Sequence, residues 1–206
     1  MYKASDDLSI GVNYRHSVRV DFDGDAEFSE AGILASSLPN GNISTSVTFP
    51  KSLALGVSYS LSEKLLVNAD YMFVGWSSFD SLIIDFETNT ALLADERSPK
   101  LYEDSWNVRF GAEYKYSEAL ALQIGYLFDK TPVQDEYFEP LLPDANRNGL
   151  AIGFDYMLND NLSLNFSYLH LLISDRESDL SASKVAFNGK YSAFAPLIGF
   201  GIGYDF

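Results

Sequence analysis

Hydrophobic and polar residues alternate along most of this chain. From Leu8 to Tyr14 the even positions are apolar, and the odd positions are Ser, Gly and Asn. A period of two is typical of β-strands, because successive side chains of a strand point to opposite faces of a sheet. The pattern therefore predicts an all-β protein. It is carried by eight segments: 8–22, 44–59 (interrupted at Pro50, where we expect a bulge or strand edge), 65–79, 106–116, 120–128, 150–158, 162–168 and 194–206.

The two faces of these predicted strands differ in an unusual way. The polar face is rich in Gly, Ser, Asn and Ala, whereas soluble β-sandwiches expose mainly Lys, Glu and Thr. The apolar face holds many of the 13 Tyr and 15 Phe residues of the chain. Small polar residues suit a crowded or water-lined barrel interior, and an apolar, aromatic face suits lipid.

The connections between the predicted strands alternate in length. Short turns occur at about 4–7, 60–64, 117–119 and 159–161, and long loops at about 23–43, 80–104, 131–146 and 175–183. Outer-membrane barrels have this arrangement, with short periplasmic turns and long extracellular loops. A periplasmic aromatic girdle is predicted beside the short turns, formed by Tyr59, Tyr114, Tyr116, Tyr156, Tyr204 and Phe206.

Composition narrows the function classes. The 206 residues include 29 acidic and 14 basic side chains, for a net charge of −15, which argues against binding to nucleic-acid phosphates. The chain has no Cys and two His, so it offers no thiolate chemistry and little for a zinc site. No apolar run is long enough for a transmembrane helix. The first residues lack the apolar region of a signal peptide, so the chain is either cytosolic or a mature, engineered or truncated one.

These observations predict a transmembrane antiparallel meander β-barrel segment of about eight strands. Residues 2–5 resemble residues 114–117, which end a predicted strand before a short turn. We therefore expect the chain to begin with the last residues of a strand. Two alternatives stay open on periodicity alone: a self-contained eight-stranded barrel with a structural or adhesive role, and a soluble β-sandwich.

Short motifs follow one another along the chain: Tyr14-Arg15-His16-Ser17, Thr48-Phe49-Pro50, Trp76-Ser77-Ser78-Phe79, Phe128-Asp129-Lys130-Thr131-Pro132-Val133, Pro143-Asp144-Ala145-Asn146-Arg147 and the terminal Tyr204-Asp205-Phe206. In order and spacing they resemble the long-chain fatty acid and aromatic hydrocarbon transporters of Gram-negative outer membranes (FadL/TodX type). The likeness covers nearly all 206 residues, but only the C-terminal part of that family's barrel.

The resemblance implies a function and partners. It implies residues 1–206 to be a single β-barrel segment without the family's N-terminal hatch and first strands. It also implies a bacterial outer-membrane channel wall for passive uptake of hydrophobic compounds such as long-chain fatty acids, with no catalysis and no cofactor. The implied partners are fatty acids or hydrocarbons, outer-membrane lipid and lipopolysaccharide, and the barrel-assembly machinery, which would recognise Phe206.

Three cations lie at or beside the long loops: Arg97, Lys100 and Arg147. In the family that this chain resembles, basic groups at that end meet the carboxylate of a bound fatty acid, and a cation in an apolar pocket can hold such a group by charge-assisted hydrogen bonds. The alternative is that these cations pair with nearby loop carboxylates such as Glu96, Glu103 or Asp144. Trp76 and Phe79 either line an apolar path or belong to an outer aromatic girdle.

Metal and catalytic chemistry find little support. Residues 144–155 fit a calcium-loop pattern except that Asp155 replaces its final glutamate, but the strand predicted over 150–158 would carry this aspartate away from the ion. An acidic cluster at 21–25 suits a solvated loop. His170, Ser174 and Asp175 are close in sequence and suggest an outer-membrane hydrolase as an alternative. We interpret His170 as a residue at a strand end, because no nucleophile motif accompanies it.

Overall fold

The computed structural model describes residues 2–28, 32–140, 143–178 and 188–205. These residues form thirteen strands and three short 3-10 helices. The strands are β1 (Tyr2–Lys3), β2 (Leu8–Arg15), β3 (Val18–Ala26), β4 (Gly41–Phe49), β5 (Ser52–Ser62), β6 (Leu65–Val74), β7 (Ser81–Phe86), β8 (Glu96–Pro99), β9 (Ser105–Lys115), β10 (Leu120–Asp129), β11 (Arg147–Asn159), β12 (Leu162–Ser178) and β13 (Gly189–Tyr204). The helices are η1 (Gly32–Ser37), η2 (Trp76–Ser78) and η3 (Asp135–Tyr137). None of the described helices is long and apolar enough to span a membrane.

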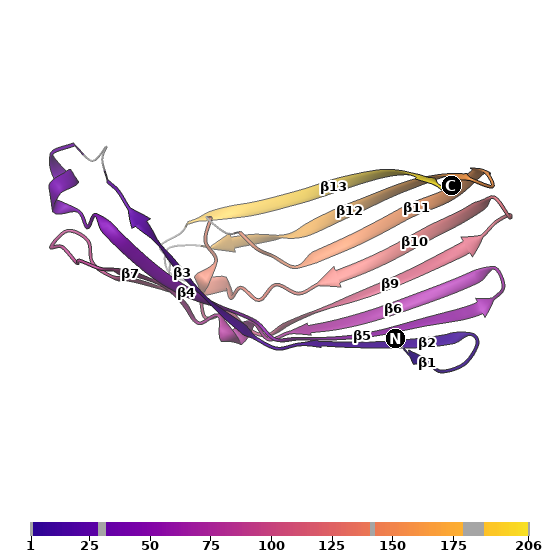
Figure 1. The fold of residues 1–206 in the computed structure, drawn as a ribbon, viewed down its shortest axis with the longest axis horizontal. Coiled ribbons are helices and arrows are strands. Elements are labelled where there is room, and N and C mark those ends of the chain that lie inside the picture. Colours follow the sequence, from indigo (N-terminus) through magenta and orange to yellow (C-terminus); the bar gives the residue numbers. More distant parts are fainter. Residues whose placement is uncertain (1, 29–31, 141–142, 179–187, 206) are drawn as a thin grey trace.

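Nine strands form the main sheet, in the order β1-β2-β5-β6-β9-β10-β11-β12-β13. Every pairing in it is antiparallel, and its long strands lie side by side in Figure 1, joined by short turns at one end. β1 and β13 are the two edges of this sheet, so it is open. The predicted antiparallel barrel wall is confirmed, whereas the alternative of a closed eight-stranded barrel is not what the described residues form.

A second sheet corrects the expected strand count. The order β3-β4-β7-β8 extends the molecule beyond the end opposite the short turns, at the left of Figure 1. Its strands lie partly in the predicted loops 23–43 and 80–104, so about eight strands was too few. β3 and β4 take up the end of the predicted segment 8–22 and the start of the predicted segment 44–59, whereas β7 and β8, of six and four residues, lie wholly in the predicted loop 80–104. The hydrophobic pattern therefore marked β3 and β4 as strands, but it showed neither β7 and β8 nor the division into two sheets.

Two breaks separate the sheets. The predicted segment 8–22 is interrupted at residues 16–17, between β2 and β3, and the segment 44–59 is interrupted at Pro50, between β4 and β5. Proline cannot donate to a sheet, and the break at Pro50 confirms the expected strand edge. These breaks take the chain from the main sheet to the second sheet and back, and it makes the same passage again between β6 and β7 and between β8 and β9.

Alternation along the main sheet produces an apolar face and a polar face. On the apolar face Phe110, Ile124 and Phe200 are 54%, 63% and 82% exposed. Such exposure of large apolar side chains is normal for a surface in lipid. The tyrosines expected as a girdle at the short-turn end are also exposed: Tyr59, Tyr114, Tyr116, Tyr156 and Tyr204. Phe206, the sixth member, lies outside the described residues.

The polar face carries a network of side chains across four neighbouring strands. The Gln123 amide donates to Glu113 Oε2 at 3.1 Å and to Asp155 Oδ2 at 2.6 Å, and Asn165 donates to the other oxygen of Asp155. Opposite these groups the strands carry glycines: a Cβ atom at Gly153 would lie 2.9 Å from Gln123 Oε1 and from the Phe166 carbonyl oxygen. The small residues of this face therefore make room for its polar side chains.

Few hydrophobic side chains are fully buried. Among the described residues the buried apolar ones are Val133, Phe138 and Ala145, and all three lie in the segment between β10 and β11, whose described residues 131–140 and 143–146 are hereafter called the 131–146 loop. The stability of the sheets rests on their backbone ladders and on the environment of the apolar face. The packed core of the described chain lies at the long-loop end.

Candidate functional site

A cavity of 410 Å³ lies at the long-loop end of the polar face and is called here the loop pocket. The sheet contributes the ends of β6, β9, β10 and β11, and the 131–146 loop contributes Pro132, Val133, Pro143 and Asp144. Its lining residues are Val74, Trp76, Tyr102, Ser105, Asn107, Asp129, Lys130, Pro132, Val133, Pro143, Asp144 and Arg147. Volume and lining fit a small-molecule site, because such sites are concave, mostly apolar and supplied with a few polar groups.

Aromatic rings form one wall. Tyr102 lies edge-on to Trp76, with ring centroids 6.0 Å apart, and edge-on to Phe79 at 5.1 Å. Edge-to-face packing at such distances is favourable for aromatic pairs. Of the two aromatic residues proposed from the sequence, Trp76 lines the loop pocket and Phe79 supports it from behind Tyr102.

The segment that presents Tyr102 has an unusual backbone. Leu101 has a φ of +43°, in the left-handed region that leucine rarely adopts. Its conformation is held from both sides: its N–H donates to the Asp80 carbonyl at 2.9 Å, and its own carbonyl accepts from Gln134 Nε2 at 2.5 Å. Strained backbone of this kind persists only where its surroundings fix it, and it clusters at ligand sites.

Arg147 is the proposed cation that reaches the loop pocket. Its guanidinium pairs with Asp129 at 3.0 Å and with Asp144, and its side chain is 37% exposed. The second oxygen of Asp144 accepts from Thr131 Oγ1 at 2.6 Å. The pairing of Arg147 with Asp144 was the alternative considered from the sequence, and the structure contains it.

The other two cations lie outside the pocket lining. Lys100 is buried and pairs with Glu139 of the 131–146 loop. Arg97, on β8 of the second sheet, pairs with Asp80 at 2.9 Å and is 64% exposed. The three cations that the sequence grouped together therefore occupy three different environments.

Two titratable groups near the pocket have pKa values that differ from their usual ones. Burial, reinforced by the carboxylates of Asp144 and Glu139, raises the pKa of Tyr102, so its hydroxyl stays protonated well above neutral pH. Hydrogen bonds from the hydroxyl and N–H of Ser77 hold the pKa of Asp104 below its usual value. The second interaction fixes η2 against the segment that carries Tyr102.

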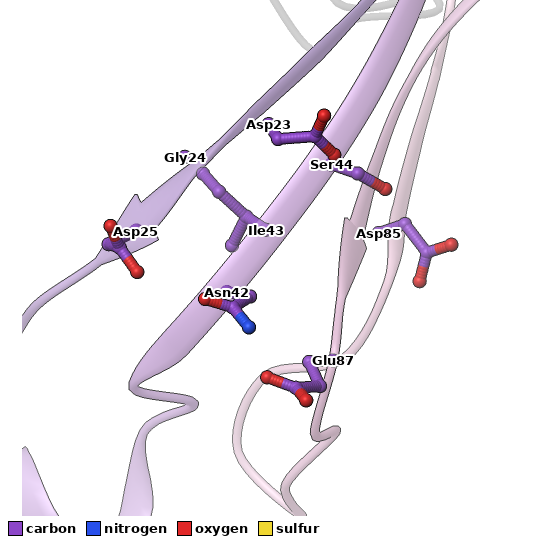
Figure 2. A pocket seen from close by; sticks show the side chains of 8 residues that line it. All are labelled: Asp23, Gly24, Asp25, Asn42, Ile43, Ser44, Asp85 and Glu87. Carbon is purple, nitrogen blue, oxygen red and sulfur yellow. The ribbon is translucent and has the colours of Figure 1, made fainter.

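A larger cavity of 560 Å³ opens on the second sheet, between β3, β4 and β7. It is lined by Asp23, Gly24, Asp25, Asn42, Ile43, Ser44, Asp85 and Glu87. Figure 2 shows the carboxylates spread around β4 without converging on one point. No group of metal-ligating side chains is present in the part of the chain that the structure describes, so this surface is best interpreted as a solvated acidic patch.

The remaining sequence motifs hold other contacts. In the calcium-like motif, Asp155 lies within β11 and binds Gln123 of the polar network, whereas Asp144 precedes β11 and binds Thr131. In the hydrolase alternative, His170 lies 3.0 Å from the Tyr168 hydroxyl, and Asp175 pairs with Lys190 at 2.8 Å. Both motifs therefore serve structural contacts in the described chain.

Sequence reasoning missed one residue of the pocket lining and one buried residue that contacts the 131–146 loop. Tyr102 stands in a predicted loop, and only its aromatic character among acidic neighbours could have marked it. Arg176 lies in β12 as a rare basic residue in that stretch, yet it is buried. No local pattern predicts which loop will fold over such a side chain.

Comparison with known proteins shows what the chain is similar to. The family model described as "Outer membrane protein transport protein (OMPP1/FadL/TodX)" matches residues 1–206. An outer membrane protein of Neisseria meningitidis serogroup B is 28% identical over the whole chain, which covers 49% of that protein. The long-chain fatty acid transport protein of Escherichia coli is 24% identical over 82% of the chain, covering 40% of that protein. The chain thus spans about half the length of the curated relatives it matches, or less.

Solved structures show the same fold. A Pseudomonas aeruginosa FadL homologue superposes with a TM-score of 0.81 at 20% identity, over 99% of this chain and 50% of that one. The Pseudomonas putida toluene transporter TodX gives a TM-score of 0.57 at 22% identity, over 86% of this chain and 42% of that one. The open sheet therefore has the arrangement of a stretch of these barrels, and the soluble β-sandwich is excluded.

Proposed function

The chain belongs to the outer membrane transport protein family OMPP1/FadL/TodX, and from that premise we propose that it forms the wall of a channel for passive uptake of hydrophobic compounds. Its location is the bacterial outer membrane, as for the relatives named above. The observation that carries the proposal is the loop pocket, with its aromatic wall and its place on the polar face.

The open sheet is proposed to be part of a larger barrel. Its edge strands β1 and β13 present backbone N–H and C=O groups, and unpaired backbone groups are costly in lipid. Further strands that pair with both edges would satisfy them. In this arrangement the long loops face the cell exterior and the short turns face the periplasm, where Phe206 would serve recognition by the assembly machinery. The outer-membrane lipid and lipopolysaccharide would cover the apolar face.

The loop pocket suits an amphipathic ligand of low polarity. Rings and prolines line it, namely Trp76, Tyr102, Pro132 and Pro143, together with Val74 and Val133. An apolar compound partitions into such a cavity without an energy source, because removing apolar surface from water is favourable by itself. Uptake then proceeds down the concentration gradient of the compound.

Arg147 is proposed to meet the polar end of the ligand when that end is an anion. A guanidinium has five N–H donors, so it can hold a carboxylate in addition to Asp129 and Asp144. Of the three cations considered from the sequence, Lys100 and Arg97 have their own partners outside the pocket lining. Headgroup recognition is therefore assigned first to Arg147.

Arg147→Gln is expected to weaken saturable uptake of myristate while leaving tetradecane uptake nearly unchanged. A hydrogen bond to a charged group contributes about 1.5–3 kcal/mol, so the KM for myristate should rise about tenfold or more. The measurement uses the protein expressed from its complete natural gene, in a host that lacks its own transporters of this family.

The matched control is Arg97→Gln, which removes an exposed cation of the second sheet. It should leave both KM values within about twofold of the wild type, because exposed ion pairs contribute little. Equal losses for both ligands in Arg147→Gln would indicate a disturbed pocket, and no loss for either would contradict its role in headgroup recognition.

A further inference from the structure

The 131–146 loop is fixed to the barrel wall more firmly than a solvent-exposed connection. It contains the buried residues Val133, Phe138 and Ala145. Two buried cations from other parts of the chain reach it: Lys100 binds Glu139, and Arg176 of β12 binds the loop near both of its ends. The loop also supplies one side of the loop pocket.

Arg176 makes three contacts with the loop. Its guanidinium donates to the Asp144 carbonyl oxygen at 2.9 Å and to Asp135 Oδ1 at 2.5 Å. Its central carbon lies 4.9 Å from the centre of the Phe138 ring, a favourable cation–π distance. The side chain of Arg176 is 8% exposed, so a planar, buried group joins residues nine positions apart in the loop.

A β-bulge directs Arg176 to this position. Ile173 pairs with Ala193, and Arg176 pairs with Tyr191, so β12 contains one residue more than β13 in this interval. Without the extra residue, Arg176 would fall on the apolar face with Leu172. The bulge shifts it to the polar face, where Phe138 also lies near Tyr191, with ring centroids 6.2 Å apart. Bulges commonly redirect a side chain beside a functional site.

We propose that Arg176 is a positioning residue that clamps the 131–146 loop as a fixed wall of the loop pocket. The inference rests on the proposed function, in that the pocket is taken as the site of the transported compound. Arg176 binds the backbone of Asp144, and the side chain of Asp144 binds Arg147 and Thr131. The clamp therefore sets the position of both the apolar wall and Arg147, one of the two cations in the pocket lining.

The planar fork of arginine is essential to the clamp, and its charge alone is insufficient. Two acceptors and a ring face surround the guanidinium, and lysine provides a compact ammonium that cannot satisfy all three. Arg176→Lys and Arg176→Met should both release the loop. The matched control is Lys190→Met, which removes an exposed cation of neighbouring β13 that pairs with Asp175.

The first measurement is cleavage by a Glu-specific protease, with the full-length protein purified in detergent micelles. Both variants should fold, as judged by heat-modifiable gel mobility, because the strand ladders remain. Cleavage after Glu136 or Glu139 should be at least about tenfold faster than in the wild type, since cleavage follows local opening. Lys190→Met should be cleaved at the wild-type rate. Unchanged cleavage in both Arg176 variants, or wild-type behaviour of Arg176→Lys, would overturn the clamp.

The second measurement is uptake. A displaced wall should raise the KM for myristate and tetradecane alike, by about threefold or more, whereas Arg147→Gln should affect myristate alone. Faster cleavage with both KM values unchanged would overturn the positioning role. Absence of saturable uptake by the wild type would overturn the proposed function and with it the assignment of the pocket, while the cleavage rates would still decide whether Arg176 clamps the loop.

Discussion

Ile124→Arg is expected to destabilise the folded barrel by about 2–4 kcal/mol, the cost of placing an arginine on the lipid face near the middle of the membrane. Ile124 is 63% exposed and lies near the middle of β10, a strand of ten residues. A strand of that length crosses the hydrocarbon core. The cost should appear as a lower urea midpoint of the full-length protein refolded into lipid vesicles, and as less folded protein in the outer membrane.

The neighbouring residue provides the control. Gln123→Arg places the same charge one position earlier, on the polar face, between Glu113 and Asp155. Arginine there gains two carboxylate partners on the polar face, so the urea midpoint of this variant should stay close to that of the wild type. If Gln123→Arg proved the more damaging variant, the assignment of the two faces would be reversed.

Gly153→Val is expected to destabilise the barrel by about 1–3 kcal/mol, a typical cost of overpacking. A Cβ atom at Gly153 would lie 2.9 Å from the Phe166 carbonyl oxygen. That oxygen belongs to the neighbouring strand and cannot move without disturbing the ladder between β11 and β12. We expect a lower urea midpoint and loss of heat-modifiable mobility at a lower temperature.

Gly11→Val serves as the matched control, on the same polar face but in β2. Apart from the two adjacent residues of the chain, no heavy atom lies within 4 Å of a Cβ placed at Gly11, and valine favours extended backbone. This variant should therefore be neutral or slightly stabilising. Equal destabilisation by both substitutions would show that the loss of glycine itself, and not the contact with β12, is responsible.

The sequence by itself determined most of the strands of the main sheet and, within the predicted segments, the face on which their side chains lie. Successive residues of a strand face lipid and the polar side in turn, so a few neighbouring residues are enough to assign Ile124 to the lipid face and Gln123 to the polar face. The alternation of short turns and long loops, and the strand break at Pro50, are also local properties. The motifs at 76–79, 128–133 and 143–147 also indicated the family, which the comparisons confirm.

Only the tertiary structure decided how the long-loop end is assembled. The second sheet separates from the main one where the chain breaks between β2 and β3 and between β4 and β5, and it takes in β7 and β8, which are too short to be marked by alternation. Tyr102 packs against Trp76 directly after the left-handed backbone at Leu101, and Arg176 reaches the 131–146 loop because one extra residue in β12 reverses its parity. Such contacts join residues far apart in the chain, and their geometry depends on the register of strands that no local pattern specifies.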